Sequence, residues 1–304
     1  MIEIVWALAP IFATIALGWG LKAAGFLTTA FWPQAEKLTY YLLFPALLIA
    51  NLAAARLDVL TAAPMGLALI TALLFVAGVV LLVRPLIKMD GPAFTSVFQG
   101  AIRFSTYAGI TAALALYGEA GLTLAAVALA AMIPTCNILS VAALSRYGGE
   151  GAAGWRNLVG SILKNPLILG CAVGIVVNAT GLGLPAGVDA VFEVLGRGAL
   201  GLGLLCVGAG LSLSAAKAAR REIVLVSGLK LLLLPAAAAA ACAAFGVSGL
   251  AARVAILFAA LPVAPASYVL ARQMGGDAPL MAGIVTATTV LAAFTMPAVL
   301  AILG

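Results

Sequence analysis

The sequence contains no histidine and few charged residues. Of its 304 residues, 9% are charged and 65% are hydrophobic, whereas soluble domains carry roughly 25% charged residues. Without histidine, the chain lacks Ser-His-Asp and Cys-His nucleophiles and every His-ligated metal site. The four cysteines are widely separated inside apolar runs and show no metal-ligand spacing. We therefore expect a membrane protein that is not an enzyme and that uses no metal or cofactor.

Long apolar stretches fill most of the chain. Hydropathy predicts ten membrane-spanning helices, because each crossing of a bilayer core needs about 20 mainly apolar residues. The predicted fold class is therefore an all-α polytopic membrane protein. The spans cover about 3–22, 36–55, 62–83, 94–117, 120–144, 158–179, 190–214, 222–244, 250–272 and 278–302.

The basic residues are distributed unevenly between the two sides of these spans. If the N-terminus lies outside, eleven of the 16 lysines and arginines fall at the inner ends and two at the outer ends. This bias follows the positive-inside rule, so both termini are expected outside. Topology thereby accounts for the net charge of +6, and nothing points to nucleic acid as a partner. The other three basic residues, Arg103, Arg197 and Lys230, fall inside spans.

The two halves of the chain resemble each other weakly. Four residues of the first span, ending at Gly25, match four of the sixth, ending at Gly181, at a constant offset of 156. Five spans per half is an odd number, so the second half enters the membrane from the opposite side, as in secondary transporters with inverted repeats. Two halves that merely fold alike are the alternative. We expect a first repeat over 1–144, a cytoplasmic linker over 145–157 and a second repeat over 158–304.

The fourth and ninth spans are interrupted by residues that favour an opened helix. Polar side chains break the fourth span, and two prolines lie in the middle of the ninth. Each proline removes a backbone donor, and opened backbone at membrane depth survives only against protein or a wet cavity. Two opened spans that cross would direct helix N-termini at one point, which favours an anion. The candidate substrate-binding residues are Arg103, Ser105, Thr106, Tyr107, Asn137, Pro262, Pro265 and Ser267.

Several of these residues have a second interpretation. Arg103 either makes bidentate bonds to a carboxylate or snorkels to the inner membrane face. Asn137 either hydrogen-bonds the opened segments or joins two helices structurally. For Lys230, snorkelling is favoured over a second positive charge in the site, and Glu193 is spaced to pair with Arg197 on one helix. Every other Asp or Glu lies at or near a span end, which disfavours a carboxylate-centred cation antiporter and favours an anion or uncharged solute.

Several longer motifs are distributed over the two halves of the chain. They are residues 42–48 (LLFPALL), 103–107 (RFSTY), Pro134 with Asn137, 164–167 (KNPL), 204–211 (LLCVGAGL) and the run from Pro262 through Asp277 to Thr286. With these motifs the chain resembles the auxin efflux carrier family, in its bacterial form often described as malonate-type transporters. The similarity covers essentially the full chain. One departure is Ser105, where the family commonly has Asn.

The resemblance implies two inverted five-helix repeats with broken, crossing helices 4 and 9, similar to the sodium/proton antiporter and bile-acid transporter folds. It also implies a scaffold of about 1–57 plus 158–214, dimeric through helices 2 and 7, and a transport unit of about 58–144 plus 215–304. Family substrates are organic anions such as dicarboxylates or indole-3-acetate. We therefore predict a carrier in the bacterial cytoplasmic (inner) membrane that moves a small organic anion by elevator-type alternating access. A sodium-coupled symporter of the bile-acid type is the alternative, ahead of a membrane-embedded enzyme, a receptor or a channel.

Overall fold

The computed structural model describes residues 2–54, 59–86, 89–148, 166–181, 183–185, 187–218 and 220–304. These residues form helices joined by short turns, and none of them lies in a strand, which confirms the predicted all-α class. Most of the predicted linker over 145–157 lies outside the described residues. The same is true of four basic residues used to predict the topology, Arg56, Lys88, Arg156 and Lys164.

The first half of the described chain runs from α1 to α6. Its elements are α1 (Ile2–Ala23), α2 (Phe31–Leu38), the π-helical turn η1 (Thr39–Leu43), α3 (Phe44–Ala54), α4 (Val59–Val83), the 3-10 turn η2 (Arg84–Leu86), α5 (Gly91–Ile102) and α6 (Thr106–Tyr147). The second half runs from α8 to α15. Its elements are α8 (Pro166–Thr180), α9 (Val188–Ala209), α10 (Leu213–Ala218), α11 (Arg220–Gly228), the π-helical turn η3 (Leu229–Leu233), α12 (Leu234–Ala244), α13 (Gly249–Ala260), α14 (Ala266–Gln273) and α15 (Ala278–Leu303).

Seven helical stretches of the described chain are long and apolar enough to cross a membrane. One of them, Gly91–Tyr147, has 57 residues and would measure about 85 Å at 1.5 Å per residue, too long for a single crossing. It is interrupted after Ile102 and again at Gly118, whose φ of 61° and ψ of −153° are not helical. The helices α8 and α13 are apolar but shorter. A multi-pass membrane protein is thus confirmed, while ten spans in an inverted repeat stay a prediction.

Both π-helical turns lie just before a proline. The turn η1 ends two residues before Pro45, and η3 ends two residues before Pro235. Proline has no N–H for the carbonyl four residues earlier and its ring clashes with that carbonyl, so a wider turn relieves both problems. Each π turn therefore keeps a long helix continuous and changes the direction of the side chains within the turn, which include Tyr40 and Lys230.

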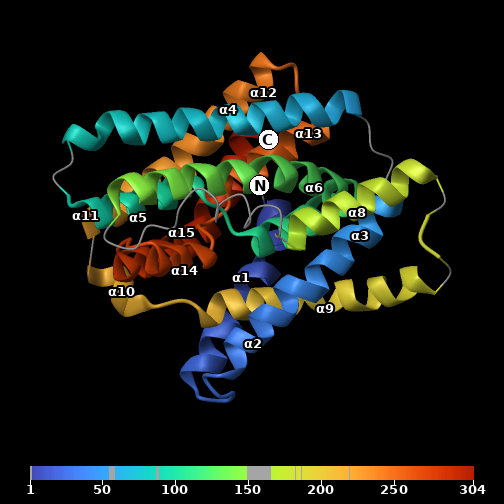
Figure 1. Cartoon of the computed structure of the whole chain (residues 1–304), viewed down its shortest axis with the longest axis horizontal. Helices are drawn as coiled ribbons and strands as arrows, with labels where there is room; N and C mark the ends of the chain where they lie inside the picture. The colour runs from blue at the N-terminus through green and yellow to red at the C-terminus, as the bar shows by residue number, and fades with distance from the viewer. Residues whose placement is uncertain are drawn as a thin grey trace.

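Two groups of helices lie on opposite sides of the bundle. The helix α1 packs most closely on α9, and α3 packs on α8 and α9, whereas α4 packs on α6 and α12. Figure 1 shows α4 and α12 along one edge and α2 and α9 along the opposite edge. The broken helices lie between these edges, where the buried core is formed.

The seventh predicted span is shorter than expected. It was predicted to reach residue 214, but α9 ends at Ala209, and Gly210 and Leu211 leave the helix. The next segment is held elsewhere, because the backbone N–H of Ser212 donates to the hydroxyl of Thr286 in α15 at 2.8 Å. The short helix α10 accordingly packs on α15 and not on the α1–α9 pair.

Candidate functional site

Two broken helices meet inside the bundle. The chain leaves α5 at Arg103 with extended backbone (φ −77°, ψ 153°) and enters α6 at Thr106. It likewise leaves α13 at Leu261 (φ −61°, ψ 149°) and enters α14 at Ala266. The breaks occur where the sequence predicted them, at polar residues in one helix and at prolines in the other.

The two extended segments touch each other directly. The backbone N–H of Ser105 donates to the carbonyl of Pro262 at 2.8 Å. Four helix ends therefore converge, the carbonyl ends of α5 and α13 and the N–H ends of α6 and α14. In α14 the N–H groups of Ser267 and Tyr268 already donate to the carbonyls of Ala264 and Pro265 at 3.0 Å. The N–H ends carry partial positive charge, and they are where an anion is stabilised.

Buried hydroxyls at this convergence have no partner within the protein. The side chains of Ser105 and Ser267 are 1% and 0% exposed, and neither hydroxyl makes a hydrogen bond with the described residues. Ser105 is the residue just before α6, and Ser267 lies in the first turn of α14. A buried hydroxyl without a partner costs free energy, so the hydroxyl of Ser105, which lines the cavity described below, is available to a ligand or to water.

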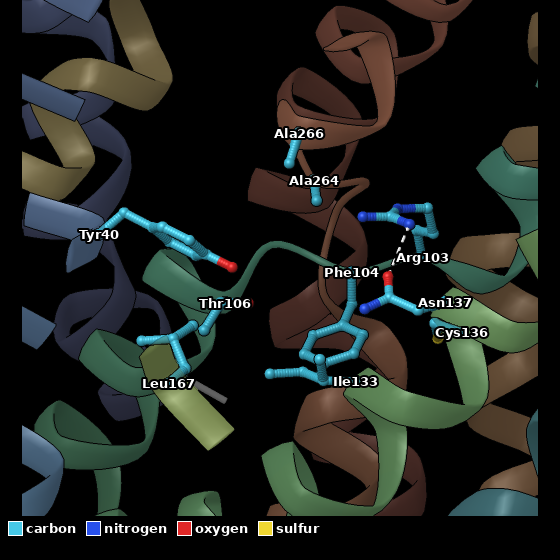
Figure 2. Close-up of a pocket in the computed structure, with 10 residues that line it drawn as sticks. All are labelled: Tyr40, Arg103, Phe104, Thr106, Ile133, Cys136, Asn137, Leu167, Ala264 and Ala266. Atoms are coloured by element: carbon cyan, nitrogen blue, oxygen red, sulfur yellow. Dashed lines mark hydrogen bonds between the residues drawn. The ribbon is translucent and has the colours of Figure 1, made fainter. Parts of the chain in front are cut away.

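A cavity opens beside the crossing. Its narrow deep part, about 100 Å³, is lined by polar and apolar side chains together (Figure 2). A wider part of about 430 Å³ shares six lining residues with it and extends toward α2. The shared residues are Tyr40, Arg103, Thr106, Asn137, Ala264 and Ala266.

Arg103 and Asn137 form a polar pair in the cavity wall. The guanidinium of Arg103 donates to the side-chain oxygen of Asn137 at 3.1 Å (Figure 2). Among the described residues, Arg103 has no acidic partner, so its charge is not neutralised by an ion pair. The Asn137 bond joins α6 to the break in the helix before it and leaves the other guanidinium donors toward the cavity.

The predicted site residues do not all face this cavity. Six of the eight line it, whereas Pro262 and Ser267 lie behind its wall. Pro262 acts through its carbonyl, which holds Ser105, and the backbone N–H of Ser267 closes a turn on Ala264 at 3.0 Å. The six that line the cavity are Arg103, Ser105, Thr106, Tyr107, Asn137 and Pro265.

The sequence analysis missed the residues that α2 and η1 contribute. Glu36, Lys37, Tyr40 and Tyr41 line the wide part of the cavity, and Figure 2 shows Tyr40 extending toward it from the side opposite Arg103. Glu36 and Lys37 were treated as residues of a span end. The signal that could have found them is the pair of adjacent tyrosines four residues before Pro45, which marks a polar face within an apolar span.

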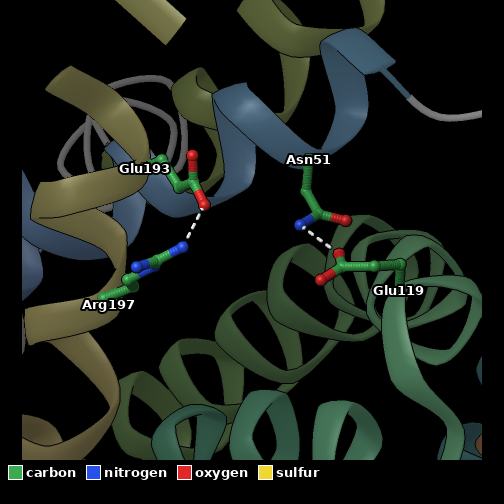
Figure 3. A network of polar contacts seen from close by, with 4 residues as sticks. All are labelled: Asn51, Glu119, Glu193 and Arg197. Carbon is green, nitrogen blue, oxygen red and sulfur yellow. Dashed lines mark hydrogen bonds and ion pairs between the residues drawn. The ribbon is translucent and has the colours of Figure 1, made fainter. Parts of the chain in front are cut away.

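The prediction for Lys230 was wrong. Its side chain is 0% exposed and its ammonium donates to the carbonyl of Ala259 at 2.9 Å, so it does not snorkel to a membrane face. The prediction that Glu193 pairs with Arg197 is confirmed, and Figure 3 shows this exposed pair on α9. The same view shows the side-chain amide of Asn51 donating to the carboxylate of Glu119 at 2.8 Å, a contact between α3 and α6.

One family model matches the second half of the chain. Residues 156–300 match the model of a family described as membrane transport protein. The matched region is a domain of the auxin efflux carrier family. This family comprises transporters and not enzymes, so the match over residues 156–300 implies a membrane transporter. No curated protein matches the sequence.

Proposed function

We propose that the protein is a member of the auxin efflux carrier family and a secondary carrier for a small organic anion. The observation that carries the proposal is the convergence of two helix N-termini, the unpartnered hydroxyl of Ser105 and Arg103 on one cavity. Each of these groups stabilises a carboxylate, and no carboxylate of the described residues forms an ion pair with Arg103, although Glu36 lines the wide part of the cavity.

The shape and lining of the cavity limit the substrate. Its deep part holds Arg103, Thr106 and Asn137, and its wide part adds apolar surface from Val141, Val269 and other residues. A small dicarboxylate or an aryl acid fits this division, with a carboxylate at Arg103 and the rest of the molecule toward the mouth. Lys37 at the mouth offers a second cation for a dianion.

The packing of the helices supports an elevator mechanism. The scaffold would be α1, α2–α3, α8 and α9, and the transport unit would be α4–α6 and α11–α15, with the broken helices in the moving unit. The ends of α1 and α9 lie together, because the ammonium of Lys22 donates to the carbonyl of Ala209 at 2.6 Å. This end also holds the cavity mouth, so with both termini outside a bacterial cytoplasmic membrane the cavity would face the cytoplasm. Dimerisation would use the scaffold helices 2 and 7.

Transport by purified protein in proteoliposomes tests the proposal. We expect saturable uptake of labelled malonate or indole-3-acetate, with Arg103→Ala reducing the affinity at least tenfold because it removes a charge-assisted hydrogen bond. Arg197→Ala is the matched control, since this arginine pairs with Glu193 on an exposed face away from the cavity. Unchanged affinity in Arg103→Ala would remove Arg103 as a ligand, and uptake that requires sodium would favour the sodium-coupled symporter.

A further inference from the structure

Lys230 is a buried cation that the proposed transport step does not use directly. It lies in the π-helical turn η3, and its side chain is fully buried. Within the described part of the chain no acidic group pairs with it. Its ammonium donates to the carbonyl of Ala259, in the last turn of α13. Burying a charge without a counter-ion costs free energy, so the group that accepts its hydrogen bond must stabilise the charge.

The partner is the carbonyl end of a broken helix. Because α13 ends at Ala260, its last carbonyls have no N–H four residues later, and the helix dipole places partial negative charge there. This end points into the same region where α6 and α14 present their positive ends. Left without a cation, it would oppose the binding of an anion beside it.

The segment that follows α13 shapes the cavity. Pro262 accepts the hydrogen bond of Ser105, and the N–H of Val263 donates to the hydroxyl of Thr288 at 3.2 Å. Two residues further on, Ala264 and Pro265 line the cavity. The bond from Lys230 is thus the first of three contacts that set the path of this segment from α13 to α14.

The other broken helix is held more weakly at the corresponding place. The carbonyl of Ile102, the last residue of α5, accepts a hydrogen bond from the thiol of Cys136 at 3.2 Å. A thiol is a weak, uncharged donor. The charged cap is therefore specific to α13, and the π turn before Pro235 is what brings Lys230 to it.

We propose that Lys230 is a positioning residue for the anion site. Its ammonium neutralises the carbonyl end of α13 and fixes the segment 261–265, so that the N-terminus of α14 faces the cavity. This role deepens the proposed carrier function and rests on it for the substrate, but the effect on the segment is independent of any ligand.

Hydrogen–deuterium exchange of the full-length protein without ligand tests the effect on the segment. In Lys230→Met we expect peptides that cover 261–268 to exchange at least tenfold faster than in the wild type, with Lys230→Arg close to the wild type. Lys22→Met is the matched control, since Lys22 also caps a helix carbonyl, that of Ala209 in α9, outside the cavity lining. It should leave the peptides over 261–268 unchanged.

Two outcomes of this experiment would overturn the proposal. One is wild-type exchange over 261–268 in Lys230→Met. The other is faster exchange spread over the whole chain, which would make Lys230 a general stability residue. If Lys230→Met does not fold, Lys230→Gln is compared with the wild type in the same way, because it keeps a neutral donor.

Binding measurements test the consequence for the anion. With malonate and indole-3-acetate as probes, we expect Lys230→Met to weaken binding at least tenfold, with a larger loss for the dianion, and Lys230→Arg to restore it. A purely structural role would weaken both probes equally, and wild-type affinity in Lys230→Met would also refute the assignment. If neither probe binds the wild-type protein, the proposed substrates are wrong, and the exchange experiment alone decides the role of Lys230.

Discussion

The contact between α1 and α9 depends on glycine and can be tested by adding one methyl group. A Cβ built on Gly208 would lie 2.8 Å from the carbonyl carbon of Ile15 and 2.9 Å from the backbone nitrogen of Trp19, and closer still to the Ile15 oxygen. It would thus sit on a backbone hydrogen bond of α1, which cannot rotate away as a side chain can. Carbon contacts need about 3.5 Å, so the two helices would have to separate by more than about 0.5 Å.

The expected cost follows from two opposing effects. Overpacking a well-packed contact costs about 1–3 kcal/mol, whereas replacing glycine by alanine within a helix returns about 1 kcal/mol. Because the added methyl group meets backbone atoms, the overpacking cost lies in the upper part of this range, at about 2–3 kcal/mol, and we expect Gly208→Ala to lower the free energy of unfolding by about 1–2 kcal/mol. Gly201 offers a matched control on the same helix, because no atom lies within 4 Å of its added Cβ. Gly201→Ala should leave stability unchanged or raise it slightly.

Thermal unfolding of the purified protein in detergent measures this difference. We expect the midpoint temperature of Gly208→Ala to fall by a few degrees, with that of Gly201→Ala at or above the wild-type value. Equal stability of Gly208→Ala and the wild type would show that α1 and α9 separate at little cost. The pair would then be a poor candidate for the rigid scaffold that an elevator mechanism requires.

Three further predictions concern the cavity and the opposite end of the bundle. Asn137→Asp should weaken binding of malonate at least tenfold, because its carboxylate would pair with Arg103 and compete with the substrate; Asn137→Leu, which removes the hydrogen bond without adding charge, should cost less in a direct binding assay. Ser105→Ala should leave the unfolding temperature unchanged, since the hydroxyl has no partner, yet weaken malonate binding several-fold if this hydroxyl contacts the substrate. Asn51→Ala and Glu119→Ala should lower the unfolding temperature by similar amounts and without additivity, because they break the same bond; additive effects would show that the two residues act separately.

The helix breaks could be predicted from sequence because their causes are local. The prolines at 262 and 265 and the polar run at 103–107 disrupt a helix by removing donors or by adding groups that need partners. The positions of α1 and α15 also agree with the hydropathy pattern within one or two residues. Local chemistry therefore predicted where the candidate site lies in the chain.

The environment of each side chain could not be predicted in the same way. Lys230 lies near the end of an apolar span, where snorkelling was the simplest expectation, but a π turn and the neighbouring α13 enclose it. Glu36 looked like a surface residue of a span end, yet α2 brings it to the cavity wall. Both differences arise from how helices distant in sequence pack, and the hydrophobic pattern within one span carries no information about that packing.

The distribution of charge ties these observations together. In the described part of the chain, Arg103 and Lys230 lie in the interior without acidic partners. The cavity wall contains one carboxylate among these residues, that of Glu36, which belongs to α2 on the scaffold side. The carbonyl ends of α5 and α13 offset part of this positive charge, and Lys230 neutralises one of them. The positive ends of α6 and α14, together with Arg103, then form no ion pair within the described residues. An organic anion supplies it, so in the proposed mechanism the substrate completes the electrostatics of the unit that carries it across the membrane.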